Sequence, residues 1–171
     1  MENKKPRLDI WGWVGLSPLI LIALLVLAFL FTELNKAYWD FRIKQMCEVD
    51  GGDTVYKKVF LDRLEFEKYF GPSGEIIAPW EGSSRRSSYK FLSRYEKTYI
   101  RKRYPEVSRN VTTIFRVSDK KVLGKSIHYH RGGGDFPTII SHPSGYSCGG
   151  DLNIGPLLNQ TILVKERNDG N

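Results

Sequence analysis

The hydrophobic positions of the chain form one long continuous block near the N-terminus, followed by short alternating runs. Residues 10–32 contain no charged side chain and consist mostly of Leu, Ile, Val, Phe and Ala. As a helix this block would be about 34 Å long, enough to cross the ~30 Å hydrocarbon core of a bilayer with some tilt. A lipid-exposed segment must satisfy its own backbone hydrogen bonds, so the block predicts a transmembrane helix over 10–32, after a short tail of residues 1–9.

A cleaved secretory signal is the main alternative interpretation of this block. Lys4, Lys5 and Arg7 would be its basic start, and residues 19–31 its apolar centre. The sequence that follows, Phe-Thr-Glu-Leu-Asn-Lys, lacks the small residues of a signal-peptidase site. The pattern therefore favours an uncleaved anchor, and the length of the block argues against a third interpretation, a buried core helix.

The helical pattern continues beyond the apolar block. Leu34, Tyr38 and Phe41 recur at i, i+4 and i+7 and form one apolar stripe, which predicts a juxtamembrane helical neck over 33–46. We expect this stripe to pack against the domain that follows.

From residue 47 onward the pattern changes to short strands and glycine-rich turns. Alternating apolar and polar positions predict strands over 54–61, 94–103, 108–117, 122–129 and 160–165. Arg109 is the one residue that breaks the apolar face of the third of these strands. Asp62 and Glu65 have the spacing of a capping box, which predicts a short helix over 63–70.

These elements define the expected fold class and domain boundaries. A mainly antiparallel sheet of four to five strands with one short helix makes an α+β domain over 47–166, followed by a flexible tail over 167–171. About 139 residues remain after the anchor, which is enough to bury a core in one domain.

Charge bears on the orientation in the membrane. The chain carries a formal net charge of +7. Three basic side chains and the α-amino group precede the span, while Lys36, Arg42 and Lys44 follow it closely. Because Lys and Arg are retained on the cytoplasmic side, this excess favours a cytoplasmic N-terminus and an extracytoplasmic domain.

The chain contains two cysteines, Cys47 and Cys148. In an oxidising compartment they predict one disulfide bond, whereas in a reducing cytosol they would be two unrelated thiols. A disulfide between them would close a loop of about 100 residues, which is worth up to ~4.7 kcal/mol in loop-closure entropy.

Three short motifs stand out within residues 45–150. They are Cys-x-x-Asp-Gly-Gly from Cys47, Gly-Gly-Gly-Asp-Phe-Pro over 132–137, and His-Pro-Ser-x-Tyr-Ser-Cys over 142–148. The set resembles a group of small bacterial membrane-anchored envelope proteins of unknown function, which have a hydrophobic N-terminus before a domain of this size. The resemblance implies a bacterial inner-membrane location, a periplasmic domain and pairing of Cys47 with Cys148, and it implies no mechanism.

Basic residues gather between positions 85 and 103, where Glu96 is the single acid. They are Arg85, Arg86, Lys90, Arg94, Lys97, Arg101, Lys102 and Arg103. With the interleaved Tyr and Phe residues, they have the composition of a nucleic-acid-binding surface. Beside a membrane the same charges would meet anionic lipid headgroups. A solvated sheet face with its aromatic residues turned inward is the plainer interpretation.

The histidines supply one metal-binding hypothesis. His128 and His130 alternate along a predicted strand, so they share the face that we expect to be solvent-exposed, and His142 could complete a zinc site. A solvated polar face explains the same pair. The Gly-Tyr-Ser-Cys-Gly sequence at 145–149 matches the serine-hydrolase elbow but lacks the strand-to-helix context which that chemistry needs.

Together these features favour a single-pass membrane protein whose domain binds a partner protein or an anionic surface, without catalysis and without a cofactor. Its partners would be the bilayer, through residues 10–32, and a membrane or envelope protein or anionic headgroups. Two alternatives stay open: a metal-dependent enzyme using His128, His130 and His142, and, for the reversed topology, a cytosol-facing nucleic-acid binder.

Overall fold

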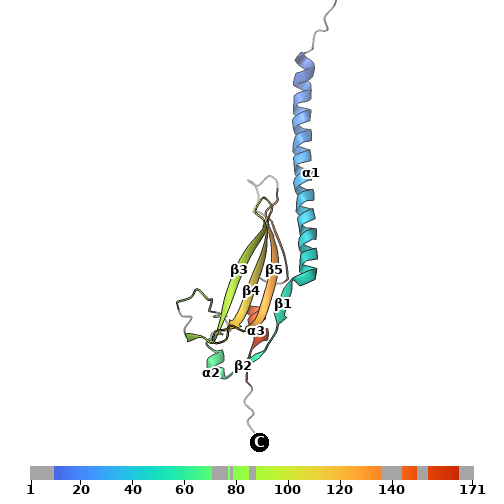
Figure 1. Cartoon of the computed structure of the whole chain (residues 1–171). Coiled ribbons are helices and arrows are strands. Elements are labelled where there is room, and N and C mark those ends of the chain that lie inside the picture. Colours follow the sequence, from blue (N-terminus) through green and yellow to red (C-terminus); the bar gives the residue numbers. More distant parts are fainter. Residues whose placement is uncertain are drawn as a thin grey trace, which may run out of the picture.

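A single long helix carries a small β domain at its C-terminal end (Figure 1). The computed structural model describes residues 10–70, 77, 79–84, 88–135, 144–149 and 154–165, with side chains from residue 18 onward. Helix α1 (Ile10–Asp50) has 41 residues, which corresponds to about 61 Å. The expected span 10–32 and neck 33–46 are therefore one uninterrupted helix, which continues through Pro18 and is long and apolar enough to cross a membrane.

The domain is built on a mainly antiparallel five-stranded sheet, which confirms the predicted α+β class. Its three long strands are β3 (Phe91–Arg101), β4 (Glu106–Arg116) and β5 (Val122–Gly132). Two short strands share the outer edge of β5: β1 (Gly52–Val55) and β6 (Gly145–Cys148). The strand order is β1-β5-β4-β3, with β6 also paired to β5.

A second small layer covers one face of the sheet at the end away from the apolar part of α1 (Figure 1). It consists of β2 (Val59–Leu61) paired in parallel with β7 (Ile162–Val164), and of helices α2 (Arg63–Phe66) and α3 (Gly155–Thr161). A Cβ atom on Gly124 of β5 would lie 2.8 Å from the Thr161 hydroxyl oxygen, so glycine allows α3 to approach the sheet closely. The resulting core is the first of two in the domain; its buried members are Leu61, Tyr69, Phe70, Phe91, Ile114, Leu123, Leu157, Leu158 and Ile162.

The predicted elements differ from the structure at their ends, the expected helix 63–70 is the shorter α2, and neither β6 nor α3 was predicted. The expected strand 54–61 is divided between β1 and β2, because the chain turns where the amides of Tyr56 and Lys57 both donate to the Leu123 carbonyl. The expected strand 160–165 begins as the last turn of α3. The predicted cap is confirmed: the Asp62 carboxylate accepts a 2.8 Å hydrogen bond from the Glu65 amide at the start of α2.

Candidate membrane-proximal interface

The C-terminal part of α1 packs against the face of the sheet opposite the first core. Ile43 is fully buried there against Val107, Val111, Ile127 and Tyr129. Trp39, Met46 and Cys47, which occupy the same side of the helix, complete this second core. The helix that is apolar enough to cross a membrane is thus also a structural element of the domain.

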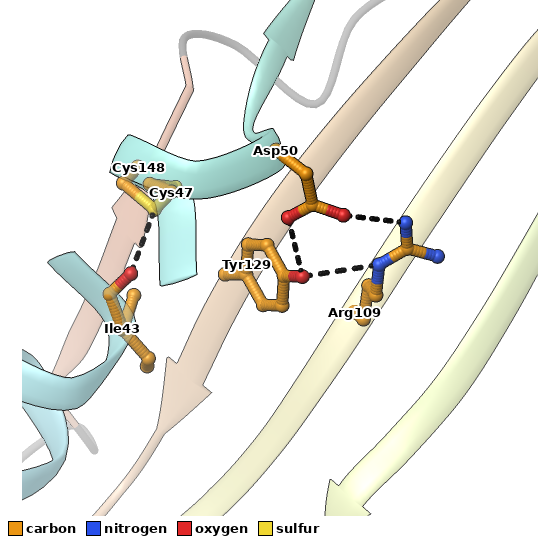
Figure 2. The surroundings of a disulfide bond; sticks show 6 residues. All are labelled: Ile43, Cys47, Asp50, Arg109, Tyr129 and Cys148. Carbon is orange, nitrogen blue, oxygen red and sulfur yellow. Dashed lines mark hydrogen bonds and ion pairs between the residues drawn. A yellow bond between two sulfur atoms is a disulfide. The ribbon is translucent and has the colours of Figure 1, made fainter. Parts of the chain in front are cut away.

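The disulfide links α1 covalently to β6 at the edge of this contact. Cys47 and Cys148 are bonded, with their Cα atoms 6.2 Å apart, which confirms the predicted disulfide (Figure 2). The Cys148 sulfur also lies 3.6 Å from the Ile43 carbonyl oxygen, one turn earlier in the helix. A pair of cysteines joined in this way is typical of an oxidising compartment.

The last residue of α1 is held by a closed triangle of polar groups (Figure 2). The Arg109 guanidinium and the Tyr129 hydroxyl donate hydrogen bonds of 2.8 Å and 2.7 Å to the Asp50 carboxylate, and Arg109 Nε also donates to the Tyr129 oxygen at 3.1 Å. The Arg109 bond, followed by that from Tyr129, lowers the pKa of Asp50. Arg109 therefore offsets an acid at the negative end of the helix dipole, and this explains why it interrupts an apolar strand face.

An ion pair between a buried arginine and a partly exposed aspartate holds the middle of this helical segment. Arg131 on β5 is buried, and its Nε donates a 2.5 Å hydrogen bond to Asp40. The same guanidinium donates to the carbonyl of Gly133. Because a buried charge without a partner is strongly destabilising, Arg131 requires Asp40, and this fixes the helix against the sheet at that level.

A third polar link lies closest to the apolar segment. Lys36 forms ion pairs with Glu33 at 2.8 Å and with Asp135 at 3.2 Å. Asp135 also accepts hydrogen bonds from the Ser144 amide at 2.6 Å and from the Ser144 hydroxyl at 2.8 Å. The bond from the Ser144 amide is the main reason that the pKa of Asp135 is lowered to about 2.

The opposite side of the neck has no contact with the domain. Leu34, Tyr38 and Phe41 are 70%, 55% and 59% exposed, so the expectation that this stripe packs against the domain is wrong. The packed side is the one formed by Trp39, Ile43 and Met46. At 100° per residue the two sets lie on opposite faces of the helix.

The turn between β3 and β4 lies beside Trp39, in the middle of the neck. The Arg101 guanidinium lies 5.2 Å from the centre of the Trp39 ring and donates to the Tyr104 carbonyl at 3.1 Å. Lys102, Arg103 and Tyr104 are exposed. We call residues 101–105 the membrane-proximal turn. Among the described residues, neither Lys102 nor Arg103 has an acidic partner.

The other basic residues predicted to share this surface lie elsewhere. Lys90 pairs with Glu65, Arg94 is held by both carboxylate oxygens of Glu81, and Lys97 pairs with Glu106 at 3.1 Å. At ~3.3 Å per strand residue, Arg94 is about 23 Å along β3 from Arg101. Arg85 and Arg86 lie outside the described residues. The structure thus brings together Arg101, Lys102 and Arg103, and separates Lys90 and Arg94 from them.

The two histidines of β5 lie on the sheet face away from α1. His128 is only 4% exposed, so the expectation that this face is solvated is wrong at His128. Its Nε2 lies 2.5 Å from Ser126 Oγ, which donates a hydrogen bond to Asp53. Burial lowers the pKa of His130, with smaller effects of Lys97 and Arg131. His142 lies outside the described residues. Within the described part of the chain, no three His, Cys, Asp or Glu side chains are grouped so that they could hold a metal ion.

Sequence reasoning missed the polar residues that hold α1 against the sheet. Asp40 and Arg131 lie in unremarkable local sequence, and Asp135 belongs to the Gly-Gly-Gly-Asp-Phe-Pro motif, but each finds its partner only in the folded chain. Arg109 gave a signal, because it was the one charged residue on an otherwise apolar strand face. A lone charge at such a position predicts an acidic partner from another element.

Fold and interface together define a small α+β domain joined to an N-terminal apolar helix that is either a membrane anchor or a signal sequence. Comparison of the chain with known protein families, with curated protein sequences and with solved structures finds no match.

Proposed function

We propose that the chain is a single-pass protein of the bacterial inner membrane, with the N-terminus in the cytoplasm and the domain in the periplasm. The domain is non-enzymatic, and its membrane-proximal turn contacts the headgroups of anionic phospholipids. The resemblance of the cysteine and glycine motifs to membrane-anchored envelope proteins is consistent with this location.

The continuity of α1 supports an anchor over a cleaved signal. Signal cleavage would fall after the apolar block, between about residues 31 and 36, and there the chain is in the middle of a helix. The residues just beyond belong to the domain, since Lys36 pairs with Asp135 and Ile43 is part of a core. The disulfide supports an extracytoplasmic domain, in agreement with the Lys and Arg distribution.

The position of the turn along α1 is the observation that carries the proposed headgroup contact. Trp39, which stacks with Arg101, lies seven residues after Thr32, or about 10 Å along the helix axis. Lys36, which pairs with Asp135, lies about 6 Å beyond Thr32. Headgroups extend roughly 5–8 Å beyond each side of the hydrocarbon core. The exposed Lys102 and Arg103 are thus held within a side-chain length of the headgroups.

The charges on the turn are suited to this contact. A basic residue near an anionic membrane surface contributes about 1 kcal/mol, so Lys102 and Arg103 together would contribute about 2 kcal/mol. The contribution falls off over the Debye length, which is ~10 Å at 0.1 M salt. We therefore expect a contact that depends on lipid charge and weakens as salt is raised.

Hydrogen exchange of the full chain in nanodiscs tests this proposal. Amides of residues 101–107 should exchange more slowly in discs containing phosphatidylglycerol than in discs of phosphatidylcholine alone, and added salt should abolish the difference. The double variant K102Q/R103Q should lose the difference. The double variant K57Q/K58Q is the matched control: it removes the same charge from exposed residues between β1 and β2, at the other end of the sheet.

Two outcomes contradict the proposal. One is equal exchange of the turn in neutral and anionic discs. The other is equal loss of protection in both double variants, which would mean that only net charge matters. Protection of the turn that appears only when other envelope proteins are present would favour a protein partner in place of lipid.

A further inference from the structure

Three buried polar atoms on the sheet face away from α1 have no hydrogen-bond partner. They are His128 Nδ1, His130 Nδ1 and Ser108 Oγ, three of the five such side-chain atoms among the described residues. Ser108 on β4 is directly opposite His130 on β5 in the strand register, and His128 is the next residue on the same face. The three atoms thus belong to adjacent positions on one surface.

Such a group needs a physical explanation. A buried donor or acceptor without a partner costs roughly 1–3 kcal/mol, and the large majority of buried side-chain polar atoms in native proteins are paired. Three in adjacent positions indicate a bound species that pairs with all of them. The other unpartnered buried atoms, on Trp39 and Arg101, lie at the membrane-proximal interface instead.

The hydrogen bonds around His128 determine which kind of species fits. The Asp53 carboxylate can only accept, so the Ser126 hydroxyl must donate to it. The Ser126 oxygen then accepts from His128, which places the ring proton on Nε2. Nδ1 of His128 is consequently unprotonated. Its lone pair is free and points away from the hydrogen bonds to Ser126 and Asp53. An anion would need a donor at this position, whereas a metal ion needs a lone pair.

The same arrangement is found around histidines that bind metals. Such histidines donate their other ring N–H to a carboxylate, a carbonyl or a water, which fixes the ring and raises its basicity. Here His128 Nε2–H donates to the Ser126 hydroxyl, which in turn donates to the Asp53 carboxylate. The neighbouring glycines let the backbone lie close to the two rings: a Cβ atom at Gly149 would lie 3.2 Å from His128 Nδ1, and one at Gly145 would lie 3.3 Å from His130 Cε1.

We propose that His128 and His130 bind a divalent late transition-metal ion through their Nδ1 atoms, with the Ser108 hydroxyl and water completing its coordination. Imidazole ligands favour Zn²⁺, Cu²⁺ and Ni²⁺ over Mg²⁺ and Ca²⁺. Successive residues on one strand face are about 6.6 Å apart, within the span that two imidazole rings can bridge through one ion. The cysteines do not compete for the metal, because they are joined in the disulfide. The site is independent of the proposed contact with lipid.

Calorimetric titration of the full chain with Zn²⁺, in detergent and with a histidine-free affinity tag, tests the site. We expect one ion per chain, and loss of that binding in H128Q and in H130Q. S126A keeps both rings but removes the acceptor of the His128 N–H, so its affinity should fall by about 10–100-fold. H142Q is the matched control, since His142 is the remaining histidine of the chain. Binding that survives H128Q or H130Q, or is lost only in H142Q, overturns the proposal.

A second measurement keeps the proposal testable if a histidine variant fails to fold. In wild-type protein labelled with ¹⁵N-histidine, Zn²⁺ should shift the Nδ1 resonances of two histidines and leave their Nε2 resonances close to their starting values. Shifts confined to Nε2, or the absence of any shift at saturating Zn²⁺, overturn the proposal.

Discussion

Asp135 illustrates how single polar residues position the domain beside α1. Its carboxylate accepts two hydrogen bonds from Ser144 and pairs with Lys36, so it joins the end of β5, the start of β6 and the helix. These bonds favour the ionised form and lower the pKa of Asp135 from 3.8 to about 2. The link nearest the apolar segment is therefore maintained by a carboxylate that stays charged through most of the acid range.

The first prediction concerns this carboxylate. The pKa of Asp135 is lower in the folded chain than in the unfolded chain, so on acidification the unfolded chain takes up this proton at a higher pH. The free energy of unfolding therefore decreases as the pH is lowered from about 4 to about 2. At neutral pH, D135N should be less stable than wild type by about 1 kcal/mol, the difference between charged and neutral hydrogen bonds. Urea unfolding of the full chain measures this difference, which should shrink towards zero at pH 2. A difference that stays constant with pH would contradict the account.

At the scale of elements, the C-terminal third of α1 is a structural part of the domain as well as a continuation of the apolar helix. Ile43 is fully buried in the second core, while Phe41, two residues earlier, is exposed. The two side chains lie on opposite sides of one turn, so they offer a comparison within a single element.

The second prediction uses that comparison. I43A should destabilise the domain by about 2–5 kcal/mol, because it removes a side chain from a core that cannot close around the cavity. F41A removes a larger side chain from an exposed site and should change stability by less than about 0.5 kcal/mol. Thermal unfolding of the two variants gives both values. A larger effect of F41A than of I43A would mean that the other face of the helix is the packed one.

The same pair shows how far the sequence could predict this contact. Leu34, Tyr38 and Phe41 have the i, i+4, i+7 spacing, but so do Trp39, Ile43 and Met46. Helical periodicity identifies both sets and cannot choose between them. The choice is made by residues distant in sequence: Cys148 bonds to Cys47, and Arg131 pairs with Asp40, both on the side of Ile43.

Elements that depend on neighbouring residues in the sequence were predicted better than elements that depend on contacts with distant residues. The apolar helix, the Asp62 cap and strands β4 and β5 were all predicted from near neighbours in the sequence, and all are present. The division of 54–61 between two sheets depends on hydrogen bonds to the distant Leu123 carbonyl. Strand β6 depends likewise on a distant partner, because it forms by pairing with the edge of β5. For the candidate sites, the sequence indicated the basic residues and the histidines but not which of them fold together.

At the scale of the whole molecule, the disulfide and the charge distribution both support a domain outside the cytoplasm. The disulfide joins the C-terminal part of α1 to β6, across 101 positions of sequence. No other cysteine exists in the chain, so thiol chemistry reports on this bond alone.

The third prediction follows from this. A membrane-impermeant maleimide added to intact bacterial spheroplasts should label the chain only after reduction, because both thiols are accessible from outside but bonded to each other. The measurement is the mass shift of the labelled chain, and C47S/C148S is the unlabelled control. Labelling that requires lysis and no reductant would instead place the domain in the cytosol with free thiols, and would make nucleic acid the leading partner for its basic turn.

The continuity of α1 has a mechanical consequence. In the proposed anchored topology, about 34 Å of apolar helix would be accommodated in a ~30 Å hydrocarbon core by tilting, and the tilt would change with the thickness of the bilayer. Because the helix passes into the domain without a hinge and is bonded to it from Lys36 to Asp50, the domain must turn through the same angle. The long strands extend about 33 Å, so a 20° change in tilt carries their far end sideways by roughly 11 Å. In the proposed anchored topology, a change in bilayer thickness would therefore displace the far end of the domain parallel to the membrane.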